Sequence, residues 1–199
     1  MNKTYSILGF KKENKNNVKS GFSNRGLELE NDINLSNEYY KIKDIAYIYK
    51  KPTPIKLVKV DYSKAQIKEA YFMAPSTTDY NGIYQGKYID FEAKETNSKT
   101  SFSLANIHPH QIDHLINVYR HGGISFVIIR FNMLNHTYLL ETKCLLEFIK
   151  DNNRKSIPIC FFKENASDIK IKFQPRVDYL EIIKKLYFGG NNYDEEKKS

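Results

Sequence analysis

The sequence predicts a mixed α/β domain, in which helices flank a mixed sheet and a two-stranded stalk protrudes from the body. Short runs rich in β-branched and aromatic residues indicate strands, and amphipathic segments at helical spacing follow several of them. Prolines at positions 52, 54 and 75 bound one pair of strands and set it apart from the rest. Strands followed by flanking helices are typical of a layered α/β sandwich.

One helix and four strands are expected before position 97. Helical spacing predicts a helix over residues 24–41, capped by Ser23, with three side chains facing the core: Leu27, Ile33 and Tyr40. β-Branched and aromatic content predicts strands over residues 44–50, 55–62, 67–74 and 88–96. The second and third strands carry lysines and are joined by a tight turn near residues 63–66, so they form the stalk. Residues 76–87 are predicted to be a turn region because they contain Asn81–Gly82 and Gly86.

Strands and helices also alternate in the second half of the chain. A polar loop is expected over residues 96–103, and a helix begins near Pro109, a favoured first-turn residue, and stops at Gly122–Gly123. The apolar run at residues 124–131 predicts a central strand. A further strand and two helices are expected at residues 136–142, 143–152 and 176–188. The apolar positions of the last helix are Val177, Leu180, Ile183 and either Leu186 or Tyr187.

The length of 199 residues is enough for one domain with a proper core. We expect a flexible basic arm at residues 1–20, a single domain at 21–190 with the stalk at about 52–76, and a disordered tail at 191–199. The lysines of the arm fit either a solvated tail or a phosphate-binding segment. The net charge of +8 and the pI of about 9.2 suit a polyanion such as nucleic acid, although the base composition of the gene is an alternative cause.

The cysteines and the hydropathy of the sequence indicate the cellular compartment in which the protein is expected. Cys144 and Cys160 are isolated, which predicts buried, reduced side chains and argues against zinc bound through cysteine. No apolar run approaches the roughly 20 residues that cross a bilayer. The first residues contain no apolar stretch of signal-peptide length. We therefore expect a cytoplasmic protein with no membrane partner.

The pattern that carries chemistry is Asp79, a spacer of twelve residues, then Glu92 and Lys94. Side chains alternate between the faces of a strand, so Asp90, Glu92 and Lys94 share one face of residues 88–96. Two carboxylates on adjoining strands supply oxygen ligands for a hard divalent cation, and a neighbouring lysine contacts a phosphate or the attacking water. This set suits phosphodiester hydrolysis, and its order is that of the restriction-endonuclease-like nucleases. The alternative is a solvated face of mixed charge. For Asp90 a salt bridge is the preferred interpretation.

Eight sequence blocks carry a resemblance to a known family. In chain order they are SNRGLELEND, KKPTP, KEAYF, STTDYNGIYQGKYIDFEAKET, KTSF, HPHQIDHL, HGGISF and QPRVDYL. Through these blocks, from about Ser23 to Phe188, the chain resembles the RecU family of Holliday junction resolvases. The resemblance implies a restriction-endonuclease-like nuclease domain with a protruding stalk. It also implies a dimeric, Mg²⁺-dependent endonuclease that nicks four-way DNA junctions symmetrically in recombination and repair.

The resemblance also implies roles for individual residues. Thr77, Asp79, Glu92 and Gln111 would surround the magnesium ion, and Lys94 would stabilise the transition state. The residues themselves support Asp79, Glu92 and Lys94. Taken alone, Thr77 fits a turn and Gln111 fits an exposed helix position.

Four basic residues are candidate DNA contacts: Arg25, Lys50, Lys51 and Lys64. Arg25 precedes the first helix and has a structural salt bridge as its alternative role. Lys50 and Lys51 lie at the base of the stalk, and Lys64 is the only charge in its turn. Glu30 is left open between a site residue and a solvated helix carboxylate.

The expected partners are a DNA four-way junction and a second copy of the chain, with a recombinase left open as a third. One alternative is a nuclease of the same fold that cuts simpler duplexes or flaps. The other is a non-catalytic, junction-binding regulator of a recombinase. His110 and His114 have the i, i+4 spacing of zinc ligands, but no third ligand is suitably spaced, so zinc is not expected.

Overall fold

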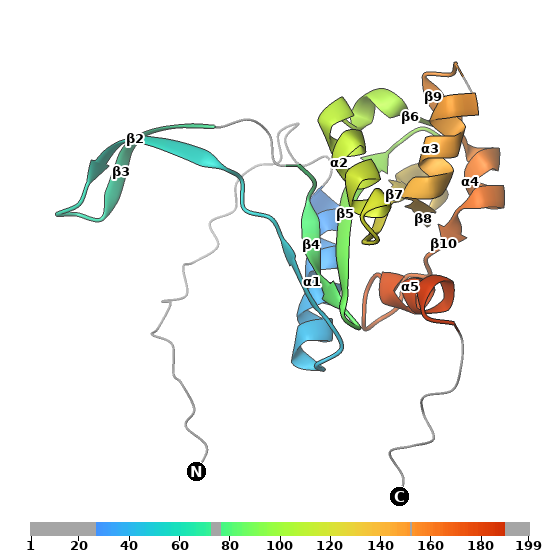
Figure 1. Ribbon diagram of the computed structural model, residues 1–199, viewed down its shortest axis with the longest axis horizontal. Coiled ribbons are helices and arrows are strands. Elements are labelled where there is room, and N and C mark those ends of the chain that lie inside the picture. The colour runs from blue at the N-terminus through green and yellow to red at the C-terminus, as the bar shows by residue number, and fades with distance from the viewer. Residues whose placement is uncertain (1–26, 73–76, 152, 190–199) are drawn as a thin grey trace, which may run out of the picture.

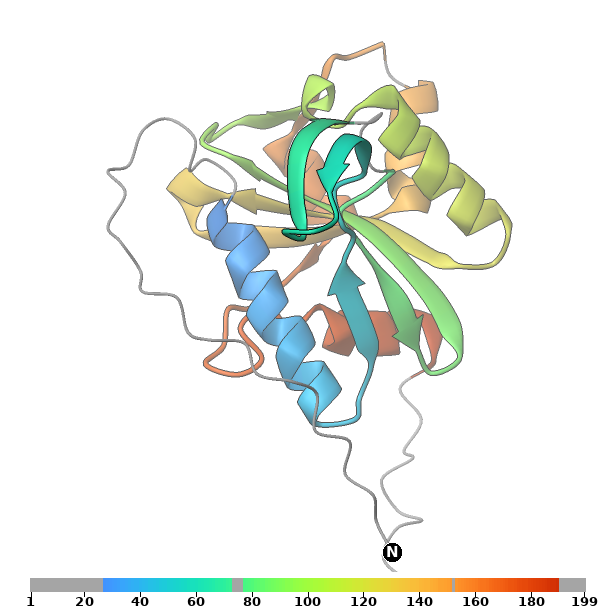
Figure 2. The same ribbon diagram turned by 90° about the vertical axis from the view of Figure 1, so that its left-hand side faces the viewer.

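The computed structural model describes residues 27–72, 77–151 and 153–189 (Figure 1). The predicted arm at residues 1–20, the tail at 191–199, Ser23 and Arg25 lie outside the described residues. The described part has a six-stranded sheet with helices on both faces, and a two-stranded hairpin extends away from it (Figures 1 and 2). The predicted fold class is therefore confirmed. In these three segments no helix combines the length and the apolar character that a bilayer crossing requires.

The central sheet is mixed, with the strand order β1-β4-β5-β7-β8-β10. Its strands are β1 (Tyr47–Lys50), β4 (Tyr80–Tyr84), β5 (Lys87–Thr96), β7 (Ile124–Phe131), β8 (His136–Glu141) and β10 (Ser167–Asp168). β5 and β7 pair in parallel, whereas the other neighbours pair antiparallel. All eight residues of β7 are buried, as the apolar run at this position predicts.

Alternation along the strands divides the core between the two faces of the sheet. On one face, buried residues of β5 and β7 pack with α1 (Leu27–Ile42) and α5 (Tyr179–Tyr187). On the other face, β7 and β8 pack with α2 (Pro109–Arg120), α3 (Thr142–Asp151) and α4 (Ile159–Asn165). Short 3₁₀ turns at Leu104–Asn106 and Asn132–Leu134 and a small two-stranded sheet, β6 (Ser101–Ser103) with β9 (Ser156–Pro158), complete the fold.

An aromatic stack anchors the first face across three strands. The ring of Phe91 lies 4.9 Å from that of Tyr80 and 4.8 Å from that of Phe126, and both ring pairs are parallel within 10°. All three residues are fully buried. Because Phe91 faces this core, its neighbours on β5 must face the opposite side of the sheet, toward α2.

The predicted stalk is the hairpin β2 (Ile55–Asp61) and β3 (Gln66–Phe72). Its strands pair with each other and form a sheet of their own. Most of its described side chains are exposed, including apolar ones such as Leu57 and Tyr62. Figure 2 shows the hairpin nearly end-on, in front of the sheet.

The structure corrects four local predictions. The turn region predicted at residues 76–87 is correct only in part: Asn81 and Gly82 lie in β4, whereas the chain does reverse at Gln85–Gly86, where both φ angles are positive (47° and 74°). The polar loop at 96–103 ends in the strand β6. Cys160 is exposed and Cys144 half-buried, so neither is the buried hydrophobe expected. Leu186 and Tyr187, the two alternatives for the last core position of the final helix, are both exposed.

Candidate active site

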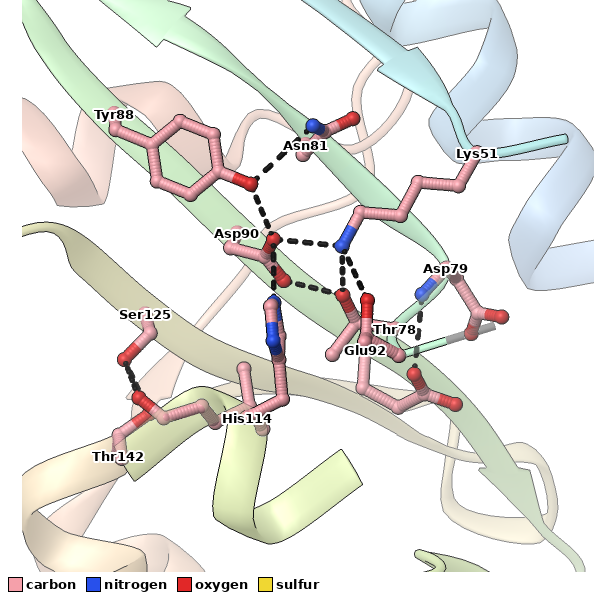
Figure 3. Close-up of polar contacts among 12 residues, drawn as sticks. Lys51, Thr78, Asp79, Asn81, Tyr88, Asp90, Glu92, His114, Ser125 and Thr142 are labelled. Carbon is pink, nitrogen blue, oxygen red and sulfur yellow. Dashed lines mark hydrogen bonds and ion pairs between the residues drawn. The ribbon is translucent and has the colours of Figure 1, made fainter. Parts of the chain in front are cut away.

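β5 carries the acidic face that the sequence indicates, and the structure buries it. Asp90 and Glu92 both have no exposed surface, so a solvated face of mixed charge is excluded. Their side chains point to the side of the sheet covered by α2 (Figure 3). A buried carboxylate needs charged or hydrogen-bonding partners, and each of these two has several.

Asp79 and Glu92 are brought together by the antiparallel pairing of β4 with β5. Tyr80 pairs with Phe91, which places the residue before β4 opposite Glu92. The backbone N–H of Asp79 donates to Glu92 Oε2 at 3.1 Å, and the N–H of Ala93 donates to Asp79 Oδ2 at 3.1 Å. The two carboxyl groups are thus fixed by reciprocal bonds to backbone amides.

The second oxygen of Glu92 accepts from two side chains. Lys94 Nζ lies 2.5 Å from Glu92 Oε1, and Gln111 Nε2 donates to the same oxygen at 2.7 Å. Burial, and next the charge of Asp79, raise the pKa of Glu92 to about 8, although the Lys94 ammonium lowers it. Burial alone lowers the pKa of Lys94, but the Glu92 carboxylate outweighs it, so the net pKa of the ammonium is raised. The acid pair therefore has more negative charge than its protein neighbours comfortably stabilise.

Gln111 reaches the site from the first turn of α2. Its Oε1 accepts the backbone N–H of His108 at 2.9 Å, which leaves Nε2 directed at Glu92. The structure therefore brings Gln111 to the acid pair, as the resemblance implies. In the described arrangement, however, its nitrogen faces the carboxylate, so Gln111 orients Glu92.

Asp90 makes the salt bridge that was the preferred interpretation. Lys51 Nζ lies 2.7 Å from Asp90 Oδ2 (Figure 3). The same ammonium donates to Thr77 Oγ1 at 3.0 Å, so Lys51 links Thr77 to Asp90. The sequence offered no signal for this pairing, since Lys51 and Asp90 are 39 residues apart.

An open cleft of about 780 Å³ adjoins the site at Ala93 and Lys94. Lys94, which is 25% exposed, lies on its wall. Glu30 of α1 also lines the cleft and is ion-paired with Lys50. The structure thus places Glu30, which the sequence left open, on the wall that Lys94 shares.

The remaining predicted residues are less directly connected. Lys64 is exposed in the turn of the hairpin, away from the cleft-lining residues. His114 Nε2 lies 3.0 Å from Asp90 Oδ2, and the rings of His108 and His110 stack with centroids 5.5 Å apart. Over the described ranges, no three His, Cys, Asp or Glu side chains are grouped so as to hold a metal ion.

Comparison with known proteins supplies the family. The model of the family described as Recombination protein U (RecU) matches residues 24–185. A Geobacillus sp. (strain WCH70) protein named Holliday junction resolvase RecU is 53% identical over 174 residues, covering 84% of this chain and 87% of the relative. A Bacillus thuringiensis (strain Al Hakam) protein of the same name is 51% identical over 177 residues, covering 86% and 88%.

The solved structures that match include that of Archaeoglobus fulgidus Hjc, a Holliday junction resolvase. It is 12% identical, has a TM-score of 0.43, and covers 72% of this chain and 95% of its own.

The mixed sheet, the flanking helices and the clustered Asp79, Glu92 and Lys94 are those predicted for the restriction-endonuclease-like class. The chain belongs to the RecU family.

Proposed function

We propose that this protein is an endonuclease that resolves Holliday junctions by nicking opposed strands in recombination and repair. The observation that carries the proposal is the convergence of Asp79, Glu92 and Lys94 beside an open cleft. Membership of the RecU family, whose curated relatives bear the name Holliday junction resolvase, supports the substrate.

A divalent cation fits the residues of this site. The raised pKa of Glu92 marks a buried acid pair whose negative charge is incompletely balanced. Two carboxylates are enough for Mg²⁺, which keeps several waters and takes further oxygens from a substrate phosphate. We propose that Asp79 and Glu92 hold Mg²⁺, with Thr77 and Gln111 as the neighbouring polar groups. When bound there, the ion supplies polarisation of the scissile phosphate and a lowered pKa for a coordinated water.

The residues of the chain contribute position and charge. Lys94 borders the cleft and, beside Glu92, is held where it stabilises negative charge that develops on the phosphate. Gln111 fixes the orientation of Glu92, and the backbone amides of residues 79 and 93 fix the acid pair. The two-stranded hairpin would enter the junction, with Lys64 at its turn, while Arg25 and Lys50 would contact phosphates.

A homodimer follows from the chemistry of the substrate. A four-way junction presents two equivalent strands to a two-fold symmetric protein, so two copies of this site would nick them symmetrically. Phosphate contacts dominate the affinity in this proposal, so binding weakens steeply as salt rises and depends little on base sequence. The proposal includes a recombinase as a further partner of the protein.

Cleavage of a labelled four-way junction tests the proposal. Wild type, Asp79→Asn and the control Asp168→Asn, on the far edge strand β10, are compared with and without Mg²⁺, beside linear duplex. Paired nicks in the junction that require Mg²⁺ and Asp79, but not Asp168, are expected. Cleavage of linear duplex at an equal rate would replace junction resolution with a simpler nuclease. Tight junction binding without cleavage by the wild type would favour the non-catalytic regulator.

A further inference from the structure

Asp90 is a buried carboxylate with four partners, one on β5 itself and three from other parts of the chain. Oδ2 accepts from Lys51 Nζ and from the Tyr88 hydroxyl, each at 2.7 Å, and lies 3.0 Å from His114 Nε2 (Figure 3). Oδ1 accepts from the Thr78 hydroxyl. A fully buried charge with this many ordered partners ties the segments that supply them to β5.

Lys51 is the cation of this network, and its ammonium is fully used. Besides Asp90, Nζ donates to Thr78 Oγ1 at 2.5 Å and to Thr77 Oγ1 at 3.0 Å. A lysine ammonium has three donor hydrogens, so these three acceptors account for all of them. With only 14% of its side chain exposed, Lys51 is poorly placed for the phosphate contact predicted from the sequence.

The segment that Lys51 holds leads directly to the acid pair. Its backbone N–H donates to the carbonyl oxygen of Asp79 at 2.8 Å, while its side chain holds Thr77 and Thr78. The backbone N–H of Asp79 in turn donates to the carboxylate of Glu92. Lys51 also precedes β2, and Thr77 follows β3, so both flanks of the hairpin meet at this ion pair.

We propose that the buried Lys51–Asp90 ion pair is a positioning device, which holds residues 77–79 so that Asp79 faces Glu92 and joins the flanks of the hairpin to the acid pair. This inference rests on the proposed function. It assigns Lys51 and Asp90 as positioning residues that act through Asp79. Binding of a junction to the hairpin would thereby affect the position of the Asp79 and Glu92 carboxylates.

A double-mutant cycle with two readouts tests the device. Lys51→Met, Asp90→Asn and the double variant are assayed for the single-turnover cleavage rate of a four-way junction, and for junction affinity over a series of salt concentrations. Misplacement of Asp79 predicts that both single variants cleave roughly tenfold to a hundredfold more slowly. The double variant should be no slower than either single, because the two residues act as one unit. Junction affinity and its salt slope should stay at the wild-type values.

Two outcomes would overturn the inference. If Lys51→Met weakens junction binding and lowers the salt slope by about one while Asp90→Asn does not, Lys51 contacts a phosphate directly. If the wild type cleaves and all three variants cleave within about twofold of it, the ion pair positions nothing that the reaction needs. Absence of cleavage by the wild type would instead contradict the proposed function itself.

Folding is controlled separately. Either single variant leaves a buried charge without its partner, whereas the double variant leaves neither charge. If a single variant unfolds, the cleavage rate of the double variant therefore tests whether the ion pair positions Asp79. Tyr88→Phe removes one hydrogen bond to Asp90 without changing charge, and is expected to slow cleavage more mildly. Lys185→Met breaks an exposed ion pair on α5 and should leave the rate unchanged. Amide exchange offers a readout without activity: the N–H groups of Lys51 and Asp79 should exchange faster in Asp90→Asn, and unchanged exchange would count against the device.

Discussion

Gly82→Ala should destabilise the edge of the sheet that leads to the stalk. A Cβ atom at Gly82 would lie 2.1 Å from the carbonyl oxygen of Tyr47 and 2.6 Å from Cα of Ile48, both backbone atoms of β1. To restore ordinary contact, β1 would have to retreat by about 1.3 Å, which a packed backbone resists. Overpacking of this kind costs about 1–3 kcal/mol, and each β1–β4 hydrogen bond that lengthens adds about 1 kcal/mol. We therefore expect a loss of about 3 kcal/mol in the free energy of unfolding.

Urea denaturation followed by circular dichroism measures this loss, with Gly86→Ala as the matched control. Gly86 has φ +74°, and no atom lies within 4 Å of the Cβ that alanine would add, so its cost is only the strain of that conformation, about 1–2 kcal/mol. The test is whether the free energy of unfolding of Gly82→Ala is clearly lower than that of Gly86→Ala. A Gly82→Ala protein as stable as wild type would refute the argument that β1 needs this close approach.

Three other substitutions probe the core, the site and the surface. Phe91→Ala removes the middle ring of the aromatic stack and should cost about 3–5 kcal/mol in urea denaturation, whereas a loss under about 1 kcal/mol would contradict tight packing there. Lys94→Met should slow junction cleavage by about a hundredfold or more with junction affinity retained, and an unchanged rate would remove Lys94 from the proposed chemistry. Hydrogen bonds, first from Lys172, lower the pKa of Glu181 from 4.5 to about 2, so its stabilisation is present above pH 4.5 and is lost as pH falls through 2. In thermal melts, the melting temperature of Glu181→Gln should therefore fall less than that of wild type between pH 4.5 and pH 2. An equal fall for both proteins would contradict a stabilising ion pair between Glu181 and Lys172.

Local pattern predicted most of the fold because the strongest elements are also the most regular. β7 is buried on both sides and reads as an unbroken apolar run, and α2 begins at Pro109 as its sequence indicates. Asn81–Gly82 misled because the dipeptide favours a hairpin turn, whereas pairing with β1 and β5 sets the register of β4. The short elements between residues 156 and 168 were not predicted, since two or three residues of strand carry no period.

The candidate site divides in the same way. Asp79, Glu92 and Lys94 lie on one local hairpin, so spacing alone indicated them, while Gln111 came only from the family resemblance. Two partners of Asp90 come from distant segments, Lys51 at 39 residues and His114 at 24 residues along the chain. The spacing of residues along the sequence cannot predict such pairings, because they form only when the whole sheet packs against α2.

The hairpin of β4 and β5 also constrains how this sequence can diverge. The twelve residues between Asp79 and Glu92 consist of strand, a reversal at Gln85–Gly86, and strand. Residues inserted at the reversal leave the pairing of Tyr80 with Phe91 intact, so the carboxylates still meet. A single residue inserted within either strand turns one carboxylate to the opposite face. Lineages that keep the activity should therefore vary the spacer in length only at its midpoint, and homologues with a longer spacer remain recognisable by an insertion confined to that point.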